Sequence, residues 1–141
     1  MFVQDRNEAR DYFFKVWEKQ KSNLPLEPIE AIISDVIHAH PEYHHYLNEK
    51  DVSYNNDFGP EQNQTNPFLH MGMHIALKEQ VGSDRPTGVN AIFNRILTRS
   101  VSIHDAEHKM MECLGTSLWQ AQRNNTLPDE NGYLDCLKRI D

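Results

Sequence analysis

All eight histidines of this chain fall into three short clusters, and each cluster contains a His-x-x-x-His pair. The pairs are His40/His44, His70/His74 and His104/His108. On a helix, residues four apart are neighbours on one face, with Cβ atoms about 5–6 Å apart. Two imidazoles at that spacing can reach one metal ion. Three such pairs therefore predict helices that converge on a metal site.

Apolar residues recur at helical spacing through most of the chain, and no segment reads as a strand. We expect helices over 5–21, 28–39, 67–80, 89–99, 102–124 and 131–139, with a short one over 42–47. The polar segment 48–66 predicts the longest loop. The sequence thus predicts an all-α fold, a compact helical bundle with four main helices and short additional ones, in a single domain over 1–141.

Two helix starts have local signals. Asn66 before Pro67 fits an N-cap followed by the first helical position, where proline loses no hydrogen bond. Ser102, with Asp105 three residues later, resembles a capping box in which Asp replaces Glu.

Composition excludes several partners. The formal net charge is −7, and the basic residues form no stripe that could neutralise phosphates or an anionic membrane surface. No apolar run approaches the roughly 20 residues that span a bilayer, and the N-terminus has no secretory signal pattern. Cys113 and Cys136 lie in no CxxC spacing, so we expect reduced thiols in a cytoplasmic protein.

The central pair lies in FLHMGMHIAL, where His70 and His74 are the polar residues of an otherwise apolar segment. A helix that is apolar around its circumference is a buried one, so both imidazoles should face the interior. Buried imidazoles need partners for their nitrogens, and a metal ion satisfies one nitrogen of each. The alternative is that each histidine bonds a backbone carbonyl or a carboxylate.

The C-terminal cluster HDAEH places His104, Glu107 and His108 on one helical face. Glu107 is a candidate ligand, base, or hydrogen-bond acceptor for a ligand histidine, and Glu112 could orient a histidine from outside the coordination sphere. HDAEH also matches H-x-x-E-H, an inverted zinc-protease pattern in which the acid activates water. The alternative is a solvated first turn of a helix.

The first cluster, HAHPEYHHYL, is the densest. His40 precedes Pro41 and is biased out of the α region, so it should act as a cap-like residue. His44 then lies one turn into the next segment, while His38 and His45 are peripheral. The alternative is a histidine-rich surface turn.

The blocks HPEYH, NPFLHMGMHIALKEQ and HDAEHKMMECLGTSLWQAQR resemble an uncharacterised family of bacterial proteins of about this length, known only as a domain of unknown function. The resemblance spans nearly the whole chain and covers all six paired histidines. The family pattern in this block is H-x-A-x-H, which does not require an acidic residue at the position of Glu107. The resemblance implies no activity.

We therefore predict that the chain binds a divalent transition metal, zinc or iron, through inward-facing histidines. The residues expected to bind it are His40, His44, His70, His74, His104 and His108. One alternative is a metal-dependent hydrolase that activates a bound water with Glu107 as base. Another is a non-enzymatic helical interaction module whose histidines are structural.

Overall fold

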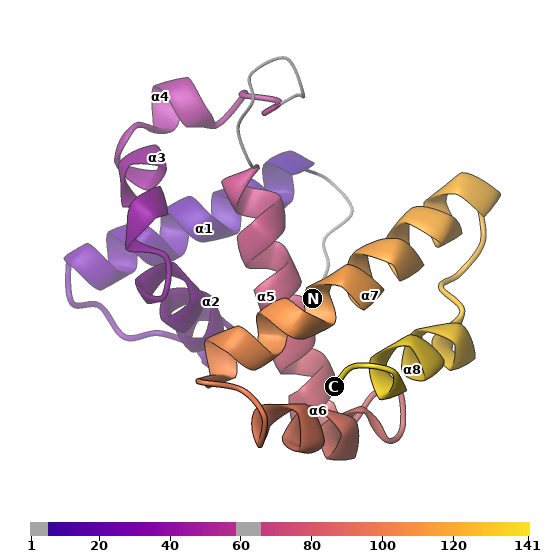
Figure 1. Cartoon of the computed structure of the whole chain (residues 1–141). Coiled ribbons are helices and arrows are strands. Elements are labelled where there is room, and N and C mark those ends of the chain that lie inside the picture. The colour runs from indigo at the N-terminus through magenta and orange to yellow at the C-terminus, as the bar shows by residue number, and fades with distance from the viewer. Residues whose placement is uncertain (1–5, 59–65) are drawn as a thin grey trace. The chain divides into compact units, whose positions relative to one another are not determined.

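The computed structural model describes residues 6–58 and 66–141, and these residues form helices and no strand (Figure 1). The predicted all-α fold is therefore confirmed for the part of the chain described. The first elements are α1 (Arg6–Lys21), α2 (Pro28–His38), the 3-10 helix η1 (Pro41–Tyr43), α3 (His44–Asn48) and α4 (Lys50–Ser53). The later elements are α5 (Pro67–Ser83), α6 (Val89–Leu97), α7 (Ile103–Asn124) and α8 (Glu130–Lys138).

The chain divides into two compact units, and each is described by itself. Unit 1 is Met1–Ile75 and unit 2 is Ala76–Asp141, so the boundary falls within the sequence of α5. The single-domain organisation stays a prediction. Among the described residues, no helix has both the length and the apolar character needed to cross a membrane.

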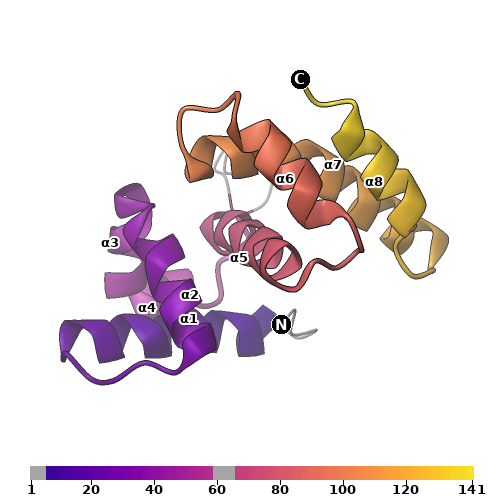
Figure 2. The same cartoon turned by 90° about the horizontal axis from the view of Figure 1, so that it is seen from below.

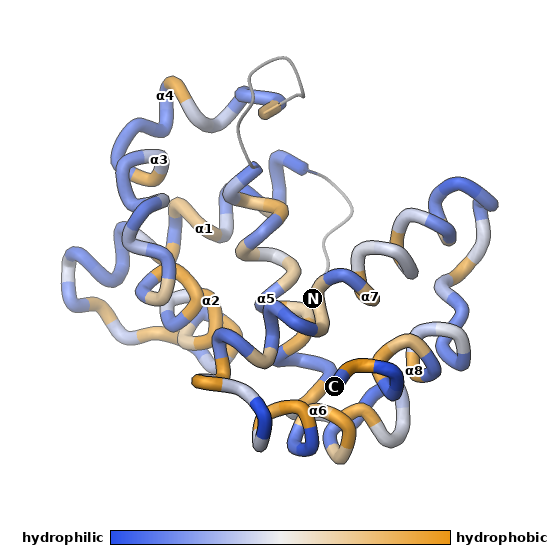
Figure 3. The backbone as a smooth tube through the Cα atoms, viewed as in Figure 1, coloured by the Kyte–Doolittle hydropathy of each residue, from blue (hydrophilic) through white to orange (hydrophobic). Residues whose placement is uncertain are grey.

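The core of unit 1 forms where α1 and α2 pack together. The apolar residues of each helix recur every three or four positions, which gives each helix one apolar stripe. Figure 3 shows α2 in largely hydrophobic colour. The buried residues of this core from α1 and α2 are Phe13, Phe14, Val16, Trp17, Ile33, Val36 and Ile37.

Arg10 is a charged residue inside unit 1, with 1% of its surface exposed. Its Nη1 atom donates to the backbone carbonyls of Ser53, Tyr54 and Asn56, at 3.1, 2.8 and 2.7 Å. The guanidinium also lies over the Phe68 ring, 4.6 Å from its centroid. Carbonyls at the end of a helix lack partners within it, and Arg10 supplies a donor to each of these three, with the Asn56 N–H as a second donor to Ser53.

Glu30 is a buried carboxylate at the start of α2. Its Oε1 atom accepts hydrogen bonds from the Glu27 backbone N–H and from Lys19 Nζ, both at 2.9 Å. These two donors favour the ionised form and hold the pKa of Glu30 below its ordinary value of 4.5.

Replacing Glu30 by Gln should therefore flatten the acid-side pH dependence of unit 1 stability. Since the folded-state pKa is lowered, the carboxylate stabilises fully above the unfolded pKa of 4.5, and this contribution is lost as pH falls through the folded pKa. Urea unfolding of wild type and Glu30→Gln at pH 7 and pH 3 measures the difference. Glu18→Gln, at an exposed pair with Lys21, is the matched control. Equal pH slopes in wild type and Glu30→Gln would contradict the expectation.

The segment after α2 differs in detail from its prediction. The expected helix over 42–47 is divided into η1 and α3. The expected loop over 48–66 contains α4, while residues 59–65 of that loop lie outside the described part of the chain. Proline at position 41 cannot donate a backbone hydrogen bond, which explains why the chain leaves α2 and starts a new turn after His40.

Unit 2 is built on α6, α7 and α8, which lie side by side in Figure 2. Ser102 caps α7 by accepting from Asp105 N at 3.1 Å, as its spacing predicts. The Tyr133 hydroxyl of α8 donates to Gln80 Oε1 at 2.6 Å. Arg95 of α6 donates to the carbonyls of Leu137 and Lys138 at the end of α8. α8 is thus held at both of its ends.

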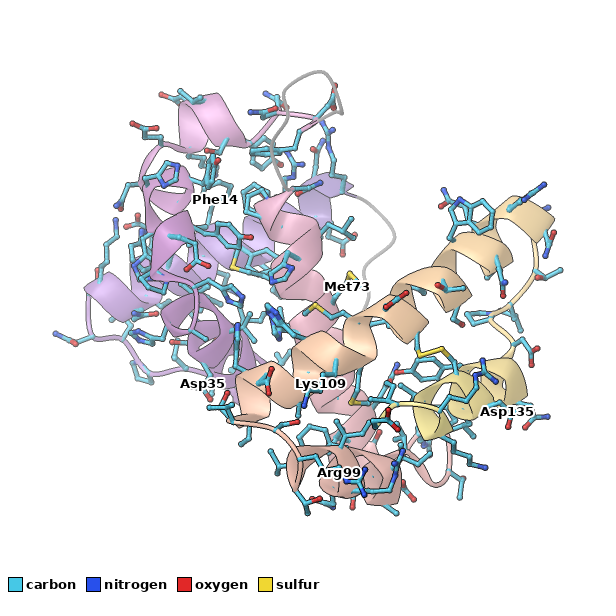
Figure 4. The ribbon with its side chains drawn as sticks, viewed as in Figure 1. Phe14, Asp35, Met73, Arg99, Lys109 and Asp135 are labelled. Carbon is cyan, nitrogen blue, oxygen red and sulfur yellow. A yellow bond between two sulfur atoms is a disulfide. The ribbon has the colours of Figure 1, made fainter. Side chains whose placement is uncertain are left out.

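The prediction of reduced thiols was wrong. Cys113 of α7 and Cys136 of α8 form a disulfide, with their Cα atoms 5.8 Å apart (Figure 4). The cysteines are 23 positions apart in the sequence, and the packing of α8 against α7 brings them within bonding range. Spacing rules for CxxC motifs do not detect a pair that only helix packing creates.

Candidate metal centre

Three imidazoles of unit 1 lie against one another. The ring centroids of His40 and His70 are 5.1 Å apart, those of His40 and His74 are 4.7 Å apart, and those of His70 and His74 are 5.0 Å apart. We call these three residues the histidine triad. His70 and His74 come from successive turns of α5, while His40 is the residue before η1.

The spacing of His40 and His74 matches the size of a metal site, whereas His70 does not belong to the histidine group whose nitrogens could share an ion. With Zn–N bonds of about 2.0–2.1 Å, the ring centroids of two imidazoles on one tetrahedral ion lie roughly 5 Å apart. The ligand nitrogens of His40 and His74 lie within 4.8 Å of each other and belong to a histidine group that could hold a metal ion. The predicted convergence of the first and central clusters is confirmed at these two residues.

Burial distinguishes the three rings. His40 and His74 each have 1% of their surface exposed, whereas His70 is half-buried. The expectation that both imidazoles of the central pair face the interior is confirmed for His74, while His70 is only half-buried. The segment is not apolar and buried all round, because Leu69 is 56% exposed.

The tautomer of His40 suits metal binding. Its Nδ1 atom lies 2.7 Å from the Val36 carbonyl oxygen, which can only accept, so Nδ1 carries the proton. In the neutral ring the lone pair is then on Nε2. Metal-binding histidines typically donate their other ring N–H to a carbonyl or carboxylate in this way, which orients the ring and raises its basicity.

Tyr43 forms an aromatic wall beside the triad. Its ring is parallel to that of His40, with an interplanar angle of 4° and the centroids 5.4 Å apart. It meets the His70 ring edge-on, with the centroids 6.0 Å apart. Burial raises the pKa of the Tyr43 phenol, and Glu42 and Tyr46 raise it further. The phenol therefore stays protonated at neutral pH and contributes a neutral surface.

His44, the other member of the first pair, lies against a different residue. Its Nε2 atom donates to the Ile37 carbonyl at 2.9 Å, and its ring packs on Trp17 at 4.8 Å. Only Nδ1 then has a lone pair for a metal. His44 as a ligand stays a prediction.

Unit 2 holds a second histidine pair. The rings of His104 and His108 lie 4.3 Å apart, and their ligand nitrogens are within 4.8 Å of each other. Both residues belong to the first two turns of α7, which Ser102 caps. His104 is half-buried and His108 is exposed. The four-residue spacing thus brings the two rings together as the sequence predicts.

The two candidate acids differ in their surroundings. Glu107 is 2% exposed, and its Oε2 atom accepts from Lys78 Nζ at 2.9 Å. If Glu107 acted as a base, a proton bound at Oε2 would therefore compete with Lys78 for that oxygen. Glu112 is exposed. Their roles as ligand, base or orienting group stay predictions.

Sequence reasoning missed two residues around these histidines. Tyr43 follows His40 by three positions, within the HPEYH block, and Lys78 follows His74 by four positions on α5. Both could have been found from the sequence, because residues three or four positions from a candidate ligand share its face of a helix.

The sequence model of a domain of unknown function, DUF1841, matches residues 5–139. The chain belongs to the DUF1841 family. The predicted membership of an uncharacterised family is therefore confirmed over almost the whole chain, and the histidine triad and the His104/His108 pair both lie inside the DUF1841 region. No curated protein and no solved structure matches the chain in the same comparisons.

Proposed function

We propose that this DUF1841 protein binds a divalent transition metal ion through its histidine clusters. The observation that carries the proposal is the pair of buried imidazoles His40 and His74, whose ligand nitrogens lie within 4.8 Å of each other. The His70 ring lies 5.0–5.1 Å from both rings and is a further candidate donor. A structural role for each ring alone requires no such common spacing.

Imidazole donors suit zinc, iron, copper and nickel, and zinc or iron is the ion that we propose. Neutral imidazole is the form that binds metal, and the hydrogen bond from His40 Nδ1 to Val36 fixes the tautomer whose lone pair is on Nε2. Thiolate ligation is not part of the proposal, because both cysteines are in the disulfide. Calcium and magnesium prefer oxygen ligands, which the triad does not supply.

The proposal includes His104 and His108 as a second donor pair, in unit 2. Their rings lie at the distance that two ligands of one ion require. His44 is included as a more distant ligand candidate through Nδ1. Six histidines exceed one tetrahedral zinc site, so the number of ions is a measured outcome of the test below.

Elemental analysis of untagged protein tests the proposal, because a histidine tag would add ligands of its own. We expect at least one equivalent of zinc or iron per chain. The double variants His40→Ala/His74→Ala and His104→Ala/His108→Ala, measured beside wild type, report how many equivalents each donor set holds. Metal-free protein that also fails to bind added Zn²⁺ would overturn the proposal.

We further propose a cytoplasmic location and no nucleic-acid partner. The charge of −7 supports the second point, since phosphate binding requires clustered basic residues. Because cytosolic disulfides are usually transient, a cytoplasmic location requires the Cys113–Cys136 disulfide to be reversible. Alkylation of free thiols in intact cells, followed by mass spectrometry of Cys113 and Cys136, measures their state where the protein works.

A further inference from the structure

The disulfide of unit 2 borders a cleft. A hollow of about 130 Å³ lies between α7 and α8, and both Cys113 and Cys136 line it. The other polar groups that line it include Thr116, Gln120 and Arg139. A small molecule in this cleft therefore meets the S–S bond directly.

The two cysteines are unequally exposed. Cys113 is 5% exposed and belongs to the buried side of α7, whereas Cys136 is half-buried. Thiol–disulfide exchange needs a thiolate to reach one sulfur along a free path. The more exposed residue, Cys136, is therefore the expected point of attack.

We propose that Cys113–Cys136 is an exchangeable disulfide and that Cys136 is its site of modification by low-molecular-weight thiols. In the first step the thiolate RS⁻ attacks Cys136 Sγ, forming the Cys136–S–S–R bond while the Cys113–Cys136 bond breaks. Cys113 leaves as a thiolate and takes a proton from water. A second RS⁻ attacks the R-bearing sulfur, which releases R–S–S–R and the Cys136 thiolate. Two thiols are oxidised and one protein disulfide is reduced.

The packing of α8 allows the bond to open while unit 2 stays folded. Tyr133 and Leu137 bury their side chains, at 5% and 0% exposure, and so contribute apolar packing in addition to the disulfide. The hydrogen bond from Tyr133 to Gln80 and the Arg95 contacts hold the two ends of α8. Because these contacts do not involve sulfur, reduction removes one covalent link and leaves the helix docked.

The cleft also favours the products of the exchange. Arg139 lines it, and a nearby cation stabilises a thiolate over a thiol. A low-molecular-weight thiol is the expected partner, because only its sulfur end has to enter the cleft beside Cys136. This site is independent of the proposed metal centre, since neither cysteine belongs to a histidine cluster.

Native oxidised protein incubated with millimolar reduced glutathione tests the proposal. We expect the disulfide to open without denaturant, and hydrogen exchange of α8 amides to stay protected afterwards. A disulfide that opens only in urea, or loss of α8 protection on reduction, would overturn the proposal. This measurement needs no variant.

Single-cysteine variants test which sulfur reacts. Cys113→Ser, which leaves Cys136, should form a glutathione adduct with oxidised glutathione at least about tenfold faster than Cys136→Ser, because reaction at buried Cys113 requires local opening. Intact mass spectrometry at equal pH gives both rates. Equal rates, or a faster reaction at Cys113, would exclude Cys136 as the site of attack.

Discussion

Zinc-loaded wild-type protein is expected to lose thermal stability when a chelator is added, and His74→Ala should lose less. The unfolded chain has no preformed site, so metal binding free energy contributes to folding. His74 is 1% exposed and contacts both other rings of the triad. Removing its imidazole therefore removes a central donor.

The expected size of this effect is large. Structural zinc sites contribute about 10–16 kcal/mol, so one of four ligands is worth roughly 3 kcal/mol, or about 100-fold in affinity. Competition with a chelator of known zinc affinity measures the change. His45→Ala is the matched control, because His45 is exposed and its ring packs on Tyr46, outside the triad.

A purely structural His74 predicts a different pattern. The variant would then lose about 1–3 kcal/mol through a missing hydrogen bond and a cavity, whether or not chelator is present. Identical chelator responses of wild type and His74→Ala, in protein shown to start with bound metal, would exclude His74 as a ligand.

Replacing Arg10 by Met should destabilise unit 1 by about 3 kcal/mol. Met keeps much of the side-chain volume but removes the Arg10 donor from the carbonyls of Ser53, Tyr54 and Asn56, of which Ser53 still accepts from the Asn56 N–H. Each unsatisfied buried carbonyl costs about 1–3 kcal/mol. Relief of the buried cation offsets part of this cost, since burial lowers the pKa of Arg10 and so opposes its charge.

Urea unfolding followed by Trp17 fluorescence, in a Trp119→Phe background, reports on unit 1. Arg10→Lys should fall between wild type and Arg10→Met, because an ammonium keeps the charge and lacks the planar fork. Lys21→Met removes an exposed ion pair and should change stability by less than about 1 kcal/mol. A loss no larger in Arg10→Met than in Lys21→Met would refute the structural role of Arg10.

The sequence by itself determined the helices. Apolar residues at helical spacing placed α1, α2, α6 and α7 to within a few residues. The Asn66 side chain accepts from the backbone of Phe68 and Leu69, and Ser102 accepts from Asp105, as their spacing predicts. Helical periodicity and N-cap residues depend on neighbouring positions in the sequence, so these helices can be predicted without knowing any distant contact.

Only the tertiary structure decided which histidines meet. The first pair was predicted to act together, yet His40 joins the rings of α5 while His44 packs on Trp17 of α1. The disulfide depends in the same way on α8 lying against α7. Helical spacing places side chains on a face, but the partner of that face comes from segments far away in the sequence. Packing among those segments therefore assigned the triad and paired the cysteines.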